Sequence, residues 1–290
     1  MFRLSMHARS FDAYVGGSEL NVAVLAARLG IKSRWVSRLP DNELGRMIAS
    51  RASEQGVDAQ VEWTADGRVG LYFLQSGAAV HITSVLYDRA GSAFSKITAG
   101  SVDWASLLSG ARWYHVSGIT PALSDGAAQV TAESLAAARH AGLTVSYDLN
   151  YRAKLWSAER ARAVQEPLFE HVDVLVIAEE DARVVFGTPS PESLAQRFKL
   201  KAVAMTLRDN PCSAILWADG ERHTAPRHAV DTVDRIGAGD AFTGGLIVSR
   251  LANQGWDQAV RFATATAALK HTIPGDFCLI DRAAVDRLLR

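Results

Sequence analysis

A glycine-bracketed turn that ends in a carboxylate stands near the carboxyl end of the chain. It reads Gly237-Ala238-Gly239-Asp240, and an apolar run with helical spacing follows it. Glycine permits positive φ and the close approach of a ligand. A helix start adds free N–H groups and the positive end of the helix dipole. The turn therefore predicts an anion site suited to a phosphoryl group, in which Gly237, Ala238 and Gly239 form the anion hole.

Asp240 falls in the first turn of the predicted helix, where it can stay ionised and accept a proton from an attacking hydroxyl. Taken alone, Gly-x-Gly-Asp fits better a turn in which the aspartate caps the helix. A dinucleotide-binding glycine loop does not fit, because that loop follows the first strand of a βαβ unit. The chain also has no Gly-Lys-Ser/Thr, so a P-loop of the Walker type is excluded.

Length and charge limit the classes of protein that are possible. The 290 residues suit one large α/β domain or two small ones. Lys+Arg and Asp+Glu both number 31, so no basic excess indicates a nucleic-acid or membrane partner. The two cysteines, Cys212 and Cys278, form no disulfide framework or zinc spacing, and we expect a cytoplasmic protein. No apolar run is long enough to span a bilayer, and the start lacks the pattern of a secretory signal.

Short apolar runs alternate with helical patterns from about residue 111 onward. The predicted strands are Arg112–Ser117, Leu143–Asp148, Val172–Ala178, Ala202–Leu207 and Ser213–Ala218. The predicted helices are Glu19–Leu29, Ser124–Ala141, Ala158–Phe169, Glu180–Phe186, Pro191–Phe198, Gly239–Leu251 and Trp256–His271. This alternation predicts an α/β fold with a mostly parallel sheet, covered by helices on both faces.

The region from about residue 59 to residue 96 has a different pattern. Two β-rich stretches, Val69–Leu74 and Ala79–Tyr87, are split by Ser76-Gly77, and no helical pattern lies between them. A β-hairpin set against the α/β body is predicted, in the position of a small flap or lid. Two more strands of the main sheet are the alternative.

Two distant segments resemble the signatures of one enzyme family, the ribokinase (PfkB) family of carbohydrate kinases. Ile236–Phe242 is similar to the family's C-terminal signature, and Gly16–Ala23 with Ala27–Gly30 is similar to its N-terminal signature. The resemblance covers essentially the whole chain. It implies one ribokinase-like domain over residues 1–290, with a β-flap lid formed mainly by about 59–96. It also implies ATP and Mg²⁺ as cofactors.

Four further stretches resemble the 2-keto-3-deoxygluconate kinases within that family. They are Tyr87–Arg89, His115–Leu123, Asp148–Trp156 and Ala268–Phe277. The resemblance implies ATP-dependent phosphorylation of 2-keto-3-deoxy-D-gluconate at O6, which gives 2-keto-3-deoxy-6-phosphogluconate. Two alternatives stay open. One is a kinase of 2-keto-3-deoxygalactonate, fructose or ribose, and the other is a relative that binds a sugar acid without turnover.

The resemblance also implies roles for single residues, and Asp240 is then the catalytic base. The residues implied at the sugar are Gly16, Gly17, Asn21, Tyr72, Tyr87, Arg89, Arg152 and Asp276. Those implied at the nucleotide are Asn150, Thr206, Arg208, Gly237 and Gly239. Arginine suits the carboxylate of a sugar acid because it offers paired donors. Taken singly, each of these residues would be an ordinary turn, packing or surface residue.

Three segments depart from the family pattern. The Asn-x-x-Glu motif that organises Mg²⁺ reads Ala178–Asp181, so we expect Asp181 or Glu179 to serve the metal. The nucleotide loop reads Thr206–Pro211 and lacks its glycines, and Arg208 is expected at a phosphate instead. The strand that usually precedes the equivalent of Phe2 is short or missing, which would leave its neighbours' backbone groups unpaired.

An apolar flap needs cover on its outer face. Trp63, Tyr72, Phe73 and Ile82 could supply a partner surface there. We therefore expect a homo-oligomer that assembles through the flaps.

Overall fold

A computed structural model describes residues 1–7, 9–75, 84–207 and 212–290. Its main sheet has the strand order β12-β11-β10-β9-β8-β7. The strands are β7 (Trp113–Ser117), β8 (Thr144–Asp148), β9 (Val174–Ala178), β10 (Ala202–Leu207), β11 (Ser213–Ala218) and β12 (Glu221–Thr224). Strands β7 to β10 are parallel, whereas β11 and β12 are antiparallel to their neighbours. The predicted, mostly parallel sheet is confirmed.

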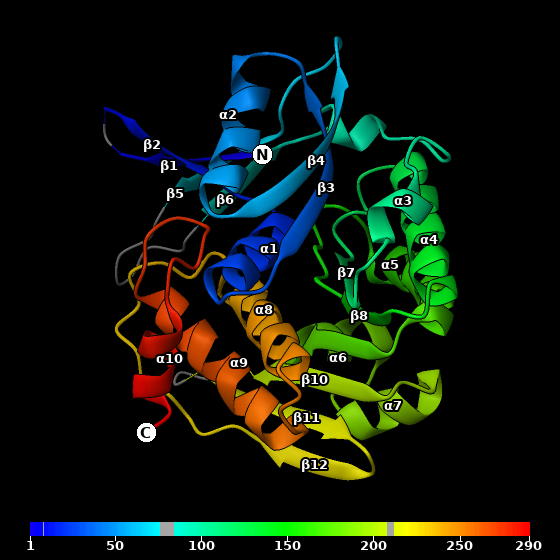
Figure 1. Cartoon of the computed structure of the whole chain (residues 1–290), viewed down its shortest axis with the longest axis vertical. Coiled ribbons are helices and arrows are strands. Elements are labelled where there is room, and N and C mark those ends of the chain that lie inside the picture. Colours follow the sequence, from blue (N-terminus) through cyan, green and yellow to red (C-terminus); the bar gives the residue numbers. More distant parts are fainter. Residues whose placement is uncertain (8, 76–83, 208–211) are drawn as a thin grey trace.

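Helices cover both faces of this sheet because its strands are apolar on both sides (Figure 1). Val174 and Val176 of β9 pack in the core beneath α8 (Ala238–Leu251) and α9 (Trp256–His271). Leu175 and Ile177 point the other way, into a second core. The helices on that side are α4 (Asp125–His140), α5 (Ala158–Gln165), α6 (Glu179–Phe186) and α7 (Pro191–Phe198).

One predicted helix is shorter than expected. The prediction ran from Ala158 to Phe169, but α5 ends at Gln165 and a 3₁₀ segment, Glu166–His171, follows it. Pro167 explains the change, because proline has no backbone N–H and its ring crowds the preceding turn.

The first helix, α1 (Ser18–Arg28), is buried against α8. Leu25 and Ala26 of α1 share a core with Ala241 and Val248 of α8. This contact brings the start of α1 beside the start of α8. The remaining helical segments are α2 (Glu43–Glu54), η1 (Phe94–Lys96), α3 (Trp104–Leu108) and α10 (Arg282–Leu288). Within the described residues, none of the helices has the length and apolar character needed to cross a membrane.

A second sheet has four strands in the order β2-β1-β5-β6 and lies beside α1 and α2 (Figure 1). We refer to it as the lid, and its action as a lid stays a prediction. Its strands are β1 (Phe2–Met6), β2 (Phe11–Val15), β5 (Leu71–Gln75) and β6 (Ser84–Asp88). Strands β5 and β6 pair antiparallel, as the predicted hairpin requires, and the Ser76-Gly77 turn lies outside the described residues. Half of the lid therefore comes from residues 2–15, which the sequence analysis did not place there.

The stretch at residues 57–64 does not belong to the lid sheet. It forms β4 (Val57–Thr64), which pairs in parallel with β3 (Ser33–Pro40). The reason is α2, which lies between these two strands in the chain and serves as the crossover that parallel strands need. Within the described residues, β3 pairs only with β4 and β7 only with β8, so both strands have an unpaired edge.

The two faces of the lid differ in chemistry. One row across the four strands faces the body, and it consists of Tyr14, Arg3, Tyr72 and Tyr87. The next row faces away, and it consists of Ala13, Leu4, Phe73 and Leu86. Leu86 is 67% exposed, whereas Tyr72 is 6% exposed.

This alternation corrects the expected partner surface. Tyr72 is buried against the body and cannot contribute to it, although Phe73 lies in the outward row. Trp63 is 38% exposed but belongs to β4, where Arg46 stacks on its ring at 4.9 Å. Ile82 lies outside the described residues.

Candidate active site

Asp240 lies in the first turn of α8, as predicted, and α1 holds both of its carboxylate oxygens. Ser18 Oγ donates to Asp240 Oδ1 at 2.6 Å, and Asn21 Nδ2 donates to Asp240 Oδ2 at 2.7 Å. Ser18 and Asn21 are three residues apart, so a helix places them on the same face. The Oδ1 atom of Asn21 is buried without a hydrogen-bond partner among the described residues. This leaves one acceptor beside Asp240 for a ligand hydroxyl.

The surroundings of Asp240 act on its pKa in opposite directions. Enclosure in the site raises the pKa, whereas the hydrogen bonds from Ser18 and Asn21 and the positive charge of Arg152 lower it. The balance leaves the pKa above its ordinary value. Such a carboxylate is a stronger base than a solvated aspartate and is still held by two donors.

The predicted anion turn has the backbone that its sequence requires. Gly237 caps α8 with φ 82°, and a Cβ there would lie 2.2 Å from the carbonyl oxygen of Asp276. No other residue type fits this position without moving the backbone. The turn places the N–H groups of Gly239 and Asp240 at the start of the helix, where they have no intrahelical acceptor. This backbone could accept an anion, and contact of the turn with a phosphoryl group stays a prediction.

The N-terminal glycines and Asp276 meet on the other side of the turn. A Cβ on Gly16 would lie 2.0 Å from Asp276 Oδ1, so glycine is required for the carboxylate to fit. Gly17 caps α1, and its carbonyl oxygen accepts the N–H of Asn21 at 2.7 Å. The Tyr72 hydroxyl donates to Asp276 Oδ1. Burial raises the pKa of Asp276 to about 6, although Tyr72 and the charge of Arg3 act in the opposite direction.

Arg89 is a buried cation with unused donors. It is 5% exposed and lies over the ring of Tyr87 at 4.1 Å. Its Nε and Nη2 atoms have no hydrogen-bond partner among the described residues. Burial lowers its pKa, and the charge of the nearby Arg152 acts in the same direction. A buried guanidinium with free donors is unfavourable unless an anion pairs with it, so this geometry suits a ligand carboxylate.

The predicted nucleotide residues are only partly brought together. Asn150 has φ 41°, and its Nδ2 donates to Ser18 Oγ at 3.1 Å, so it supports the group that holds Asp240. Thr206 is half-buried near the end of β10, while Gly237 and Gly239 lie in the anion turn. Arg208 lies outside the described residues. Contact of these residues with a nucleotide stays a prediction.

Asp148 lies in the site, although its sequence pattern predicted no role for it. Asp148 ends β8 and is 8% exposed, and its Oδ1 accepts the N–H of Asn150 at 3.0 Å. Burial raises its pKa to about 8, with a further contribution from the negative charge of Asp240. The signal for this residue was its position at the carboxyl end of a buried strand, where α/β enzymes place ligand contacts.

The two expected metal ligands lie in different surroundings. Asp181 is buried, and its negative charge contributes to the raised pKa of Asp148. Glu179 is partly exposed, and its Oε1 lies 3.7 Å from Arg183 Nη2. In the described part of the chain, no three His, Cys, Asp or Glu side chains are grouped to hold a metal ion. Asp181 therefore lies beside the site, whereas Glu179 lies beside a surface arginine.

Known proteins with similar sequences and folds are sugar kinases. A profile of the pfkB family carbohydrate kinases matches residues 3–276. A 2-dehydro-3-deoxygalactonokinase of Haloferax volcanii is 40% identical over 98% of this chain and 90% of its own length. A 2-dehydro-3-deoxygluconokinase of Thermoproteus tenax is 31% identical over 92% of this chain and 82% of its own length.

The fold comparison agrees. The crystal structure of a Thermotoga maritima 2-dehydro-3-deoxygluconokinase superposes with a TM-score of 0.96 and 37% identity. The match covers 100% of this chain and 95% of that one. The fold is therefore ribokinase-like, as predicted. The chain belongs to the pfkB family of carbohydrate kinases, and it is a sugar kinase.

Proposed function

We propose that this sugar kinase uses ATP to phosphorylate 2-keto-3-deoxy-D-gluconate at O6, giving 2-keto-3-deoxy-6-phosphogluconate. The observation that carries the proposal is Arg89, a buried guanidinium with unused donors in the lid. A sugar acid would pair its carboxylate with Arg89, with Arg152 beside it. The names of the relatives from Thermoproteus tenax and Thermotoga maritima support this acceptor.

The proposed chemistry follows from the geometry around Asp240. The sugar hydroxyl would donate its proton to Asp240 as its oxygen attacks the γ-phosphorus of ATP, and the bond from phosphorus to the bridging oxygen of ADP would break. Charge on the phosphoryl oxygens would be stabilised by the N–H groups at the start of α8. The Asn21 Oδ1 atom would orient the hydroxyl.

Asp148 and Asp181 are two buried carboxyl groups that interact electrostatically, and a pair of oxygen ligands of this kind suits a divalent cation. Burial, with further contributions from the negative charges of Asp240 and Asp181, raises the pKa of Asp148 to about 8, and a bound cation would favour its ionised form. We infer that these two side chains would hold Mg²⁺, either directly or through water, with Glu179 as the weaker candidate. When bound, Mg²⁺ supplies charge neutralisation at the phosphates.

The alternatives are a kinase of the epimeric acid, a kinase of a neutral sugar and a relative without turnover. A kinase of the epimeric acid is favoured by the Haloferax volcanii relative, and both acids would use the same two arginines. A neutral sugar such as fructose or ribose would leave the Nε and Nη2 atoms of Arg89 without a hydrogen-bond partner among the described residues. A relative without turnover would have no need for the two hydrogen bonds that hold Asp240. The cytoplasmic location stays a prediction.

We also infer that the protein is a homo-oligomer joined through the outward face of the lid. Met6, Phe11 and Leu86 are 44%, 54% and 67% exposed on this face, and Phe11 packs edge-on against Phe73 at 6.1 Å. A sheet face with this much exposed apolar surface is suited to burial against a second copy of itself.

The Asp240→Asn substitution should lower kcat by about 10²–10⁴-fold, because it removes the base and keeps the shape of the site. The measurement is ADP release coupled to a reporter enzyme, run over a panel of sugar acids and neutral sugars. Asp257→Asn is the matched control, since Asp257 lies in the first turn of α9 and pairs with Arg261 at 2.8 Å. Near-native turnover by Asp240→Asn would contradict the assignment.

The Arg89→Met substitution should raise KM for the sugar acid by about 10–100-fold, the cost of losing charge-assisted hydrogen bonds. KM for fructose should not rise, because a neutral sugar has no carboxylate to lose. Arg68→Met is the control, since Arg68 is a lid-side arginine that pairs with Asp88 at 2.6 Å. Equal losses for acid and neutral sugars would show that Arg89 does not select for charge.

The Ser18→Ala substitution should move the acidic limb of the kcat/KM profile to higher pH. Ser18 stabilises the ionised form of Asp240, so removing its hydroxyl raises the pKa of Asp240 further. Activity requires the ionised base and is then lost at a higher pH during acidification. Ser124→Ala, which removes the cap of α4, is the control and should keep the wild-type limb. A limb that stays in place or moves down contradicts the role of Ser18.

The Leu86→Lys substitution should reduce the mass measured by light scattering, because it places a charge in the proposed interface. The control is Val184→Lys, which changes an apolar residue that is 44% exposed on α6. A wild-type protein that is monomeric at micromolar concentration would refute the interface.

A further inference from the structure

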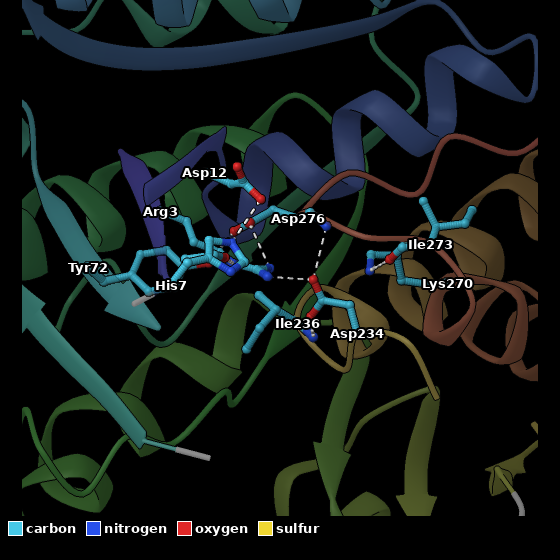
Figure 2. A network of polar contacts seen from close by, with 11 residues as sticks. Arg3, His7, Asp12, Tyr72, Asp234, Ile236, Lys270, Ile273 and Asp276 are labelled. Atoms are coloured by element: carbon cyan, nitrogen blue, oxygen red, sulfur yellow. Dashed lines mark hydrogen bonds and ion pairs between the residues drawn. The ribbon is translucent and has the colours of Figure 1, made fainter. Parts of the chain in front are cut away.

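A buried ion network joins the lid to the body beneath the anion turn (Figure 2). At its centre is Arg3 of β1, which is 3% exposed. Its Nη2 donates to Asp234 Oδ2 at 2.5 Å, and its Nη1 donates to Asp276 Oδ2 at 3.3 Å. One lid guanidinium therefore contacts two carboxylates of the body.

Asp234 connects this guanidinium to the backbone of the anion turn. Its Oδ1 accepts the N–H of Ile236 at 3.0 Å, directly before Gly237. Its Oδ2 accepts the N–H of Gly275 at 2.9 Å, directly before Asp276. The Asp234 carboxylate thus links the start of the anion turn to the segment that carries Asp276 and fixes the distance between them.

The lid holds Arg3 in place from its own side. Arg3 Nε donates to Ser5 Oγ at 3.0 Å, and the guanidinium lies over the ring of Tyr14 at 5.0 Å. Tyr72, its neighbour in the same row, donates its hydroxyl to the other oxygen of Asp276. Arg3 and Tyr72 therefore couple the position of the lid sheet to the carboxylates of Asp234 and Asp276.

Two other cations lie near the network but use different partners. Lys270 is fully buried, and its Nζ donates to the carbonyl oxygen of Ile273 at 2.8 Å. The amino group of Met1 donates to the carbonyl oxygen of Gly16 at 3.0 Å. Among the described residues, Arg3 is the cation that forms ion pairs with Asp234 and Asp276. Removing it leaves the two buried carboxylates without an ion pair among the described residues.

We infer that Arg3 is a positioning residue for phosphoryl transfer, acting through Asp234 on the Gly237–Asp240 turn. The Arg3–Asp234 ion pair fixes the position of Asp240 and of the N–H groups of the turn relative to a sugar enclosed by the lid. The inference rests on the proposed transfer at that turn. Because misplacing reacting groups by a fraction of an ångström to an ångström costs rate rather than affinity, the effect belongs in kcat.

The test compares Arg3→Met, Arg3→Lys and Asp234→Asn by steady-state kinetics and thermal unfolding. Arg3→Met should lower kcat by about 10–100-fold while KM for ATP and for the sugar acid changes by less than about threefold. Arg3→Lys keeps the charge but cannot bridge two carboxylates, so its kcat should lie between those of Arg3→Met and the wild type. Arg34→Met is the control, since Arg34 pairs with Asp58 at 2.8 Å on the surface and should keep wild-type kcat.

A double variant separates positioning from general stabilisation. If Arg3 acts through Asp234, the Arg3→Met/Asp234→Asn protein should be about as slow as the slower single variant, because the second change removes nothing more. Losses that multiply would overturn the inference. A loss confined to KM for the sugar would also overturn it, since Arg3 would then serve sugar binding alone.

The experiment distinguishes a variant that fails to fold, a wrong proposed function and a wrong role for Arg3. If Arg3→Met does not fold, Arg3→Lys and Asp234→Asn decide, and folded proteins with kcat within about twofold of the wild type overturn the inference. An active wild type with a slow Asp240→Asn and a normal Arg3→Met would leave the proposed function standing and sink this inference alone. A wild type inactive on the whole panel would overturn both.

Discussion

The crowding of four carboxylates in one region, three of them buried and Asp240 half-buried, is the constraint that organises the site. Asp148, Asp234, Asp240 and Asp276 all lie where α1, α8, β8 and the lid meet. A buried charge is costly unless it is paired, hydrogen-bonded or neutralised. Each outcome is seen here. Arg3 pairs with two of them, neutral donors hold Asp240, and the pKa of Asp148 rises to about 8.

This constraint ties together distant parts of the chain. The residues that compensate the carboxylates come from residues 3–21 and the lid, whereas three of the carboxylates lie at residues 234–276. The glycines at positions 16 and 237 allow both backbones to approach Asp276 closely. Packing of α1 on α8 then adds the apolar contact that holds these segments together. Pairing of the buried carboxylates and packing of the apolar core therefore both bring residues 3–21 against residues 234–276.

The sequence predicted where helices and strands lie along the chain better than it predicted which strands pair with one another. The apolar run Val172–Ala178 predicted a strand of the sheet, which is observed as β9, and the Ile236–Phe242 signature predicted the turn and helix start that are observed at α8. Strand pairing depends on long-range contacts, so the predicted flap began at about residue 59, within β4, and did not include residues 2–15. Arg3 had no local signal, because an arginine in a short strand is usually exposed. Its role is visible only once Asp234 and Asp276 are placed beside it.

The tight contacts around Asp276 have a consequence for changing the acceptor of this enzyme. Its carboxylate fills the space of a side chain at Gly16, and its backbone fills that of a side chain at Gly237. A glutamate at position 276 would add a methylene group for which there is no space. A residue shorter than aspartate would leave a void beneath the Gly237–Asp240 turn. Gly16, Gly237 and Asp276 therefore leave little room for substitution on the body side of the site. Under the proposed function, redesign of acceptor choice should therefore vary Tyr87 of β6 and Arg89, which follows it, and keep Gly16, Gly237 and Asp276.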